Sequence, residues 1–167
     1  MTKREEIKSL ISSLQNLLLL FLVLWITFAF ILGIKMAPND DMSPRISAGD
    51  ILVYYRILKD PSVQDVVLVK KNDTEYVGRV VAKGGDVVEV TDESALIING
   101  NMVAEDKIYY STPYYEGFVE YPIKLKDDEV FILADMREGG EDSRYFGPVK
   151  TKEIKGTIIG QFRRANI

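Results

Sequence analysis

A long uncharged segment near the N-terminus limits what this chain can fold into. No charged residue occurs from Leu10 to Ile34, and the part from Leu17 onward is almost wholly apolar. A helix needs about 20 apolar residues to cross a bilayer. A cleaved secretory signal has a shorter apolar core and a small-residue cleavage site, and Met36-Ala37-Pro38 makes a poor one. A buried helix of a soluble protein is the other alternative, but an all-round apolar helix needs a large core around it.

The charges that flank this segment favour an N-terminus inside the cell. Three basic residues precede the segment and one, Lys35, directly follows it; positive residues tend to stay on the cytoplasmic side. We therefore expect a single-pass protein of the cell membrane. Residues 1–9 are then cytoplasmic, residues 10–35 form an uncleaved transmembrane signal anchor, and residues 36–167 form one extracellular domain.

The composition of the chain excludes several kinds of site. There is no cysteine and no histidine. These absences remove disulfides, thiolate metal sites, Ser-His-Asp and Cys-His catalysis and a histidine pH switch. Residues 36–167 carry 17 Lys and Arg against 23 Asp and Glu, a net charge of −6, whereas phosphate binding needs a basic face. We expect no nucleic-acid partner, no metal and no other cofactor.

The part that follows the anchor has the pattern of a mainly β domain. Short β-branched and aromatic runs are bounded by turn formers, and no long helical period occurs. Asn99-Gly100 predicts a hairpin, because a type I′ turn needs positive φ at both central residues. The expected strands are Ile51–Tyr55, Val66–Val69, Tyr76–Ala82, Val87–Val90, Leu96–Ile98, Val130–Leu133 and Thr157–Phe162.

A tyrosine-rich segment lies in the middle of this domain, punctuated by Pro113, Gly117 and Pro122. Two interpretations stay open. The segment is either a long loop whose rings pack on the β core or an exposed surface that binds a partner, since tyrosine gives a large contact area at low entropy cost. The candidate partner-binding residues are Tyr109, Tyr110, Tyr114, Tyr115 and Tyr121.

Four ordered blocks carry a more specific signal. They are Asn39-Asp40-Asp41-Met42-Ser43-Pro44, Gly49-Asp50, Gly78-Arg79-Val80-Val81-Ala82-Lys83-Gly84-Gly85-Asp86 and Asp142-Ser143-Arg144-Tyr145-Phe146-Gly147. In this order, behind an apolar anchor, they resemble the type I signal peptidases. The resemblance implies a signal-peptidase-like β domain of short antiparallel strands. In active members it also implies a serine nucleophile with a lysine general base, which needs no histidine.

The departures from the family pattern fall on the positions of the chemistry. The serine position is Asp41, the lysine position is Gly78, and the hydroxyl residue that supports the lysine is Gly140. Asn39 stands at the oxyanion-donor position and can still donate. We therefore expect no catalytic residue, and we expect Gly78 to face the former cleft. The remaining cleft and scaffold positions implied by the resemblance are Asp40, Met42, Pro44, Arg79, Asp142, Ser143 and Arg144, with Asp135 and Arg137 matching beside them.

The residues leave two other catalytic arrangements open. A pair of carboxylates that share a proton, as in aspartic-protease chemistry, could come from Asp40, Asp41, Asp135 and Asp142. Adjacent aspartates point to opposite faces of an extended segment. Asp142 is a structural residue instead if it pairs with Arg144 or Arg79.

The second arrangement uses a displaced nucleophile. Ser43 lies two residues beyond the serine position, and Lys83 or Lys71 could act as its base. Such a base must lie within hydrogen-bond reach of the hydroxyl. No motif places either lysine there.

Aspartate and glycine at the two catalytic positions also resemble the catalytically empty, SipA-type signal-peptidase-like proteins of Gram-positive pilus gene clusters. That resemblance implies a membrane-anchored accessory, a chaperone or scaffold, for the sortase that polymerises pilin. Its implied partners are pilin subunits and the pilus sortase, with pilin held in the former substrate cleft. An active signal peptidase with atypical residues and a regulator of a true peptidase are the alternatives.

Overall fold

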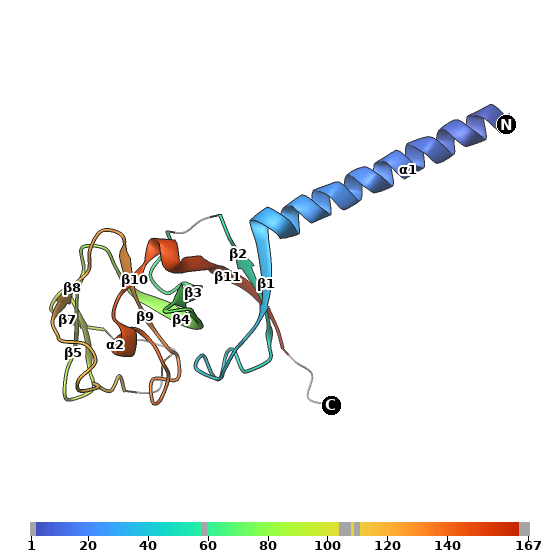
Figure 1. Ribbon diagram of the computed structural model, residues 1–167. Helices are drawn as coiled ribbons and strands as arrows, with labels where there is room; N and C mark the ends of the chain where they lie inside the picture. The colour runs from blue at the N-terminus through green and yellow to red at the C-terminus, as the bar shows by residue number, and fades with distance from the viewer. Residues whose placement is uncertain (1–2, 58–59, 104–107, 109–110, 164–167) are drawn as a thin grey trace.

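The computed structural model describes residues 3–57, 60–103, 108 and 111–163. Helix α1 (Lys3–Ile26) and a π-helical turn (Thr27–Ile31) form one apolar rod that projects from the domain (Figure 1). The rod is 29 residues long with a mean hydropathy of 2.3 in its most apolar window, and none of that window is buried. By length and composition it can cross a bilayer.

The rod ends earlier than the sequence suggested. Strand β1 (Leu32–Met36) starts directly after it, so the last residues of the expected 10–35 span belong to the sheet instead. The physical reason is strand pairing, because Leu32 adopts an extended conformation and lies opposite Tyr55 of the next strand. The expected N-terminal tail is helical from Lys3 onward.

Two antiparallel sheets form the rest of the domain. A seven-stranded sheet has the order β1-β2-β11-β3-β4-β9-β10, and a four-stranded sheet has the order β7-β6-β5-β8 (Figure 1). The prediction of a mainly β domain of antiparallel strands behind one apolar helix is confirmed. The remaining elements are β2 (Ile51–Tyr55), β3 (Val66–Lys71), β4 (Thr74–Lys83), β5 (Val87–Val90), β6 (Leu96–Ile98), β7 (Asn101–Met102), β8 (Ile123–Lys124), β9 (Glu129–Leu133), α2 (Ser143–Phe146), β10 (Val149–Lys150), a 3₁₀ turn (Thr151–Glu153) and β11 (Ile154–Phe162).

The predicted hairpin joins β6 to β7. Asn99 and Gly100 have φ of 52° and 77°, as a type I′ turn requires. Ile98 pairs with Asn101 across the turn. The Asn99 side chain also accepts a hydrogen bond from the Val87 backbone at 2.9 Å, which ties the turn to the start of β5.

Strand β4 supplies residues to three buried apolar clusters. Val77 packs in the anchor-side cluster with Met42 and Leu52. Val80 packs in the middle cluster with Ile132, whereas Val81 and Ala82 pack in the small-sheet cluster with Phe131 and the strands of the second sheet. The change of face coincides with a register shift between Val80 and Ala82 against β9. Because β4 is buried along most of its length, the residues that it carries at the site are fixed by packing on both sides.

Candidate functional site

The serine position lies in a turn that is held from two sides. Asp41 follows β1, and the next residue, Met42, is buried in the anchor-side cluster with 1% of its surface exposed. The backbone carbonyl of Asp41 accepts a hydrogen bond of 2.8 Å from the Met136 N–H in the loop that follows β9. Core packing and this bond therefore fix the position of Asp41 against the 136–141 loop.

The Asp41 carboxyl group stands at the nucleophile position and has a hydrogen-bond partner of its own. The Asn39 side-chain amide donates to Asp41 Oδ2 at 2.7 Å. Burial raises the pKa of Asp41, and the negative charges of Asp142 and Glu141 act in the same direction, while the Asn39 amide and the Glu141 backbone N–H act against them. Asn39 was expected to remain an oxyanion donor, but one of its amide N–H groups is directed to Asp41. A carboxylate at this point also disfavours any second negative charge beside it.

The lysine position lies against the packed core. A Cβ atom added at Gly78 would lie 3.0–3.2 Å from the Ile132 side chain, which is fully buried in the middle cluster. The expectation that Gly78 faces the cleft stays a prediction, and a side chain at this position would contact Ile132. A lysine stem could enter if this isoleucine gave way by a few tenths of an ångström.

Gly140, at the position of the hydroxyl residue that supports the lysine, has even less room for a side chain. A Cβ atom at Gly140 would lie 2.5 Å from the Ala134 Cβ and 2.7 Å from the Met136 carbonyl oxygen. Both distances are well inside van der Waals contact, and one partner is backbone. The hydroxyl residue that the resemblance expects here therefore has no space without a shift of the 136–140 backbone.

The first of two buried ion pairs joins β4 to the end of β9. Arg79 Nε and Nη2 donate to the two Asp135 oxygens at 2.8 and 2.6 Å. The side chains are only 8% and 4% exposed. A third donor, Arg79 Nη1, reaches the Gln64 carbonyl at 2.8 Å.

The second pair surrounds the N-terminus of α2. Asp142 caps this helix by accepting from the Arg144 backbone N–H at 3.0 Å, and its two oxygens accept from Arg144 Nε and Nη2 at 2.9 and 2.7 Å. Ala134 N–H adds a bond of 2.9 Å. The Ser143 hydroxyl accepts from the Ile132 N–H at 3.0 Å. The structural interpretation of Asp142 is confirmed with Arg144 as its partner.

These pairs leave little support for a carboxylate dyad. Asp135 and Asp142 each direct both oxygens to an arginine. Asp40 is exposed and accepts from the Ala48 N–H at 2.9 Å. Asp40 and Asp41 lie in a bend and a turn and not in an extended segment. The expectation that they point to opposite faces of an extended segment was therefore wrong, although their hydrogen-bond partners do differ.

The two lysines considered as bases for Ser43 have other partners. Lys83 forms an ion pair with Asp60 at 2.6 Å. Lys71 donates to the Pro148 carbonyl and lies 3.9 Å from Glu153. The contacts described for these lysines therefore give no support to a displaced nucleophile.

The tyrosine-rich segment packs largely on the domain. Tyr114 and Tyr121 contact each other with ring centroids 5.9 Å apart and pack against the small-sheet cluster. The Tyr115 hydroxyl donates to the Arg137 carbonyl at 3.1 Å and accepts from the Gly139 N–H at 3.2 Å. Tyr109 and Tyr110 lie outside the described residues.

Two further rings, the exposed Phe118 inside this segment and the half-buried Tyr145 after it, were not among the candidate binding residues. Phe118 is 59% exposed, and its ring contacts Tyr145 with centroids 4.8 Å apart. Tyr145 also stacks on Tyr115 at 4.5 Å. Only the position of Tyr145 directly after Asp142-Ser143-Arg144 could have drawn attention to it.

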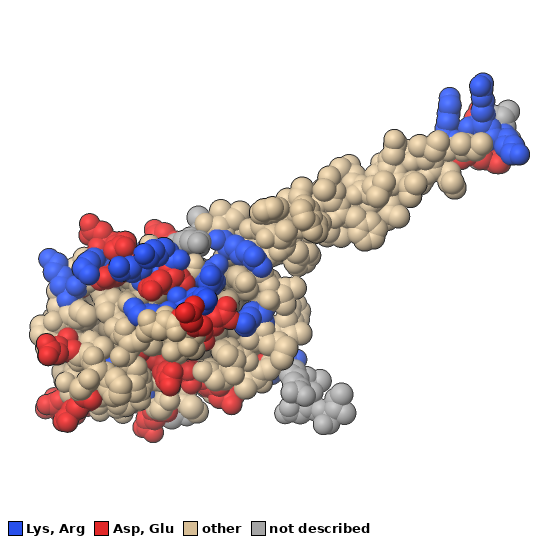
Figure 2. Space-filling model, in the orientation of Figure 1, with Lys and Arg blue, Asp and Glu red and all other residues tan. Residues whose placement is uncertain are grey.

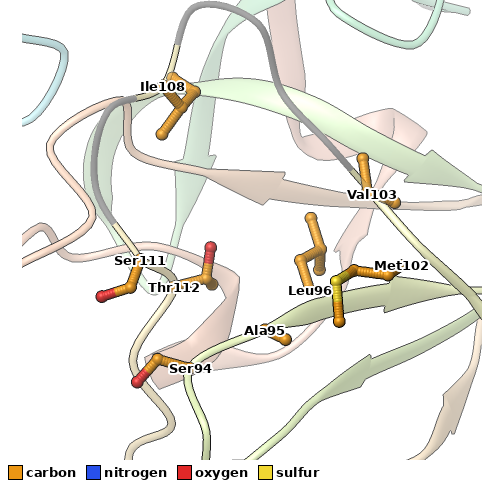
Figure 3. A pocket seen from close by; sticks show the side chains of 8 residues that line it. All are labelled: Ser94, Ala95, Leu96, Met102, Val103, Ile108, Ser111 and Thr112. Carbon is orange, nitrogen blue, oxygen red and sulfur yellow. The ribbon is translucent and has the colours of Figure 1, made fainter.

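Two cavities lie away from the catalytic positions. One, of about 320 Å³, is lined by Arg45, Ile46, Gln64, Asp65, Val66, Arg79, Ile158, Gly160 and Gln161. The other, of about 250 Å³, lies beside the hairpin of the small sheet, where Leu96 and Met102 line one side and Ser111 and Thr112 the other (Figure 3). Neither is lined by Asp41 or Gly78, so neither marks a catalytic centre.

Comparisons with known proteins agree with this geometry. A probable signal peptidase I-2 of Synechocystis sp. is 26% identical over 144 residues, which cover 80% of this chain and 64% of that protein. The inactive signal peptidase IA of Staphylococcus aureus (strain COL) is 23% identical over 164 residues, 90% of each chain. The crystal structure of a signal peptidase I from Enterococcus faecalis V583 is 26% identical, with a TM-score of 0.51, over 61% of this chain and 99% of that one.

The extent of these matches differs between relatives. The chain spans 64% of the Synechocystis protein and 37% of a probable thylakoidal processing peptidase 2 of Arabidopsis thaliana. The sequence model of the family described as signal peptidase, peptidase S26, matches residues 10–162 of this chain. That match extends from the apolar helix to the last strand, and the chain belongs to the signal peptidase family.

Proposed function

We propose that this chain is a catalytically inactive member of the signal peptidase family that binds an extended segment of a partner protein without cleaving it. The observation that carries the proposal is the packing at Gly78 and Gly140. An added Cβ meets Ile132 at one position and Ala134 and the Met136 carbonyl at the other. The base and the residue that orients it are absent from the sequence, a side chain at Gly140 would need a shift of its surroundings, and one at Gly78 would need Ile132 to give way slightly. With Asp41 at the nucleophile position, each step of serine–lysine chemistry lacks its group.

An edge strand supports binding in place of cleavage. β1 is the first strand in the order of the large sheet and pairs on one side only, with β2. An edge strand can hold a partner segment through main-chain hydrogen bonds. Because β1 leads through Pro38 directly to Asn39 and Asp41, a segment added there would run past the former catalytic position.

The apolar rod supports a membrane location for this activity. An exposed apolar patch continues from the rod across the outer face of β1, β2 and β11, where Met36 and Phe162 both lie opposite Ile51. Ile34 and Ile159 add to it, at 57% and 60% exposure. We infer that the rod anchors the chain in the cell membrane with the domain outside, and that this patch lies next to the bilayer.

The nature of the partner follows from the resemblance to the pilus-cluster proteins. We propose an accessory role, as chaperone or scaffold, in sortase-dependent pilus polymerisation, with pilin subunits and the pilus sortase as partners. A relative named as an inactive signal peptidase that aligns over 90% of both chains supports the loss of activity, and the pilus role rests on the resemblance.

A cleavage assay tests the loss of catalysis. The full-length protein in detergent should release no product from a signal-peptide substrate. Asp41→Ser with Gly78→Lys restores the two groups of the dyad and is the rescue control; product from this variant alone would show that the unaltered chain is inactive for lack of those groups. Turnover by the unaltered chain that is lost in Ser43→Ala would contradict the proposal and would favour an active peptidase with a displaced nucleophile.

A cross-linking experiment tests the binding role. The chain has no cysteine, so Pro38→Cys provides one exposed attachment point for a photoreactive maleimide at the end of β1. In cells that produce pili, the expected product is an adduct recognised by an antibody to the major pilin. Asp92→Cys, in an exposed turn of the small sheet, is the matched control. Equal adducts from both positions, or none from Pro38→Cys, would count against binding along β1.

A further inference from the structure

Three exposed or half-exposed rings form a cluster beside the former active site. Tyr115, Phe118 and Tyr145 make up this aromatic cluster, with Tyr145 in contact with both other rings. The Arg144 guanidinium covers one face of Tyr115 at 4.7 Å from the ring centroid. Phe118 is the exposed member of the cluster, at 59%, whereas Tyr115 and Tyr145 are half-buried.

The aromatic cluster is fixed next to Asp41 by one loop. The Tyr115 hydroxyl is bonded to Arg137 and Gly139 on this loop. The same loop contacts Asp41 through the Met136 N–H and through the Glu141 backbone N–H. One loop therefore contacts both the aromatic cluster and the former catalytic position.

The exposed charged side chains on the two segments that build the aromatic cluster are all acidic. The two segments that build it, residues 111–122 and 134–147, contain two basic residues, Arg137 and Arg144, and both are buried with 0% and 1% of their surface exposed. Their exposed charged side chains are Glu116, Glu120, Glu138 and Glu141. In Figure 2, acidic side chains lie along the lower edge of the domain, whereas basic side chains gather on its upper part.

We propose that the aromatic cluster and its glutamates form a docking surface for a lysine- or arginine-bearing segment of the partner protein. An aromatic face attracts a cationic side chain, and the carboxylates complement the same charge and reject acidic segments. An uncharged apolar segment would gain nothing from the glutamates. Charge complementarity therefore favours a cationic segment over an apolar one. The inference rests on the proposed binding function and specifies the chemistry of the segment that is bound.

A peptide-binding measurement tests the proposal. The probe is a fluorescein-labelled peptide of six Gly-Lys repeats, and its matched control has six Gly-Gln repeats. Fluorescence anisotropy with the full-length protein in neutral detergent should show tighter binding of the lysine peptide. Phe118→Ala should weaken that binding roughly two- to fivefold, as expected for an exposed cation–π contact. Glu138→Gln with Glu141→Gln should weaken it roughly two- to tenfold.

Two matched variants control for general effects. Phe118→Tyr keeps the aromatic ring and should retain binding. Asp92→Asn with Glu93→Gln removes two negative charges from an exposed turn elsewhere and should leave binding unchanged. Equal affinity for the two peptides, no binding of either, or an equal loss in the Asp92 and Glu93 variant would each overturn the proposal.

The cross-link from Pro38→Cys separates this proposal from the broader one. Combining Phe118→Ala, Glu138→Gln and Glu141→Gln should reduce the pilin adduct severalfold if the cluster receives a cationic part of pilin. An undiminished adduct would overturn the docking surface and leave binding along β1 intact. Absence of the adduct in the chain with an unaltered cluster would instead count against the proposed function itself.

Discussion

The buried ion pairs and the three catalytic positions lie close together in the sequence but differ in what they contain. Arg79–Asp135 and Asp142–Arg144 are hydrogen-bonded in the interior. Asp41, Gly78 and Gly140 lack the serine, the lysine and the supporting hydroxyl group, and an added side chain would meet Ile132 at Gly78 and Ala134 at Gly140. The difference teaches that a charged motif can be retained for folding alone, because a buried charge without its partner is strongly unfavourable. Retention of such a motif therefore says little about activity.

The largest effect should come from breaking one buried pair. Arg144→Ala leaves the Asp142 carboxylate buried without its guanidinium and should destabilise the protein by about 3–5 kcal/mol. Chemical denaturation in detergent, followed by circular dichroism, measures this change. Lys152→Ala, at an exposed position, is the control and should stay within about 0.5 kcal/mol of the unaltered chain. If the two variants were similarly stable, the Asp142–Arg144 pair would not be needed for folding, and its structural explanation would fail.

A smaller effect is expected when a side chain is restored at a closed position. Gly140→Ser places a Cβ against Ala134 and the Met136 carbonyl, and such overpacking should destabilise the protein by about 1–3 kcal/mol. Gly160→Ala is the matched control, because its Cβ would meet only the Val53 side chain, at 3.8 Å. A serine at residue 140 that is tolerated as well as the control would show that the position is open.

Two tyrosines of the same segment should respond differently to loss of the hydroxyl. Tyr115→Phe removes two hydrogen bonds and should destabilise the protein by about 1 kcal/mol. The buried Tyr121 hydroxyl has no hydrogen-bond partner in the described part of the chain, and burial raises its pKa. Tyr121→Phe should therefore be neutral or slightly stabilising. Thermal melts of both variants give the comparison, and equal losses would contradict it.

The smallest effect concerns the charge of Asp41. Its pKa is raised above the unfolded value of 3.8, so the folded state is favoured when the carboxyl is protonated, and this contribution is lost as the pH rises through the folded pKa. Asp41→Asn should therefore raise the melting temperature at pH 7, and its advantage should shrink as the pH falls through the folded pKa and be gone below about 4. An advantage that grows on acidification would contradict the raised pKa.

Among the described residues, sequence patterns predicted every strand of three or more residues except β1, and predicted β2, β5 and β6 to the residue; they did not predict the two-residue strands β8 and β10. β2, β3 and β9 show β-branched runs between turn formers, and Asn99-Gly100 marks its hairpin through backbone conformation alone. β8 and β10 have two residues each, too few for any period to show. β1 was assigned to the anchor because its Leu-Gly-Ile residues continue the apolar run, and only pairing with β2 makes it a strand.

The candidate site was predicted in identity but not in geometry. The blocks contain Arg79, Asp142 and Arg144, and Asp135 matches beside them; the sequence suggested Arg144 or Arg79 as the partner of Asp142 but not the pair of Arg79 with Asp135. The contact of Gly78 with Ile132 could not be read from β4, because it depends on how β4 lies against β9. Phe118 lies within the aromatic segment, but its contact with Tyr145 joins positions 27 residues apart and has no local sequence signal.

The attachment of the rod to an edge strand has a mechanical consequence. The rod continues directly into β1, and β1 is held to the sheet by its five-residue pairing with β2. Tension between a membrane-fixed rod and a load carried by the domain would therefore act on this pairing before it reached the buried strands. β1 would peel away first while the three clusters stayed folded. The same strand that offers an edge to a partner would then act as a force-sensitive release point.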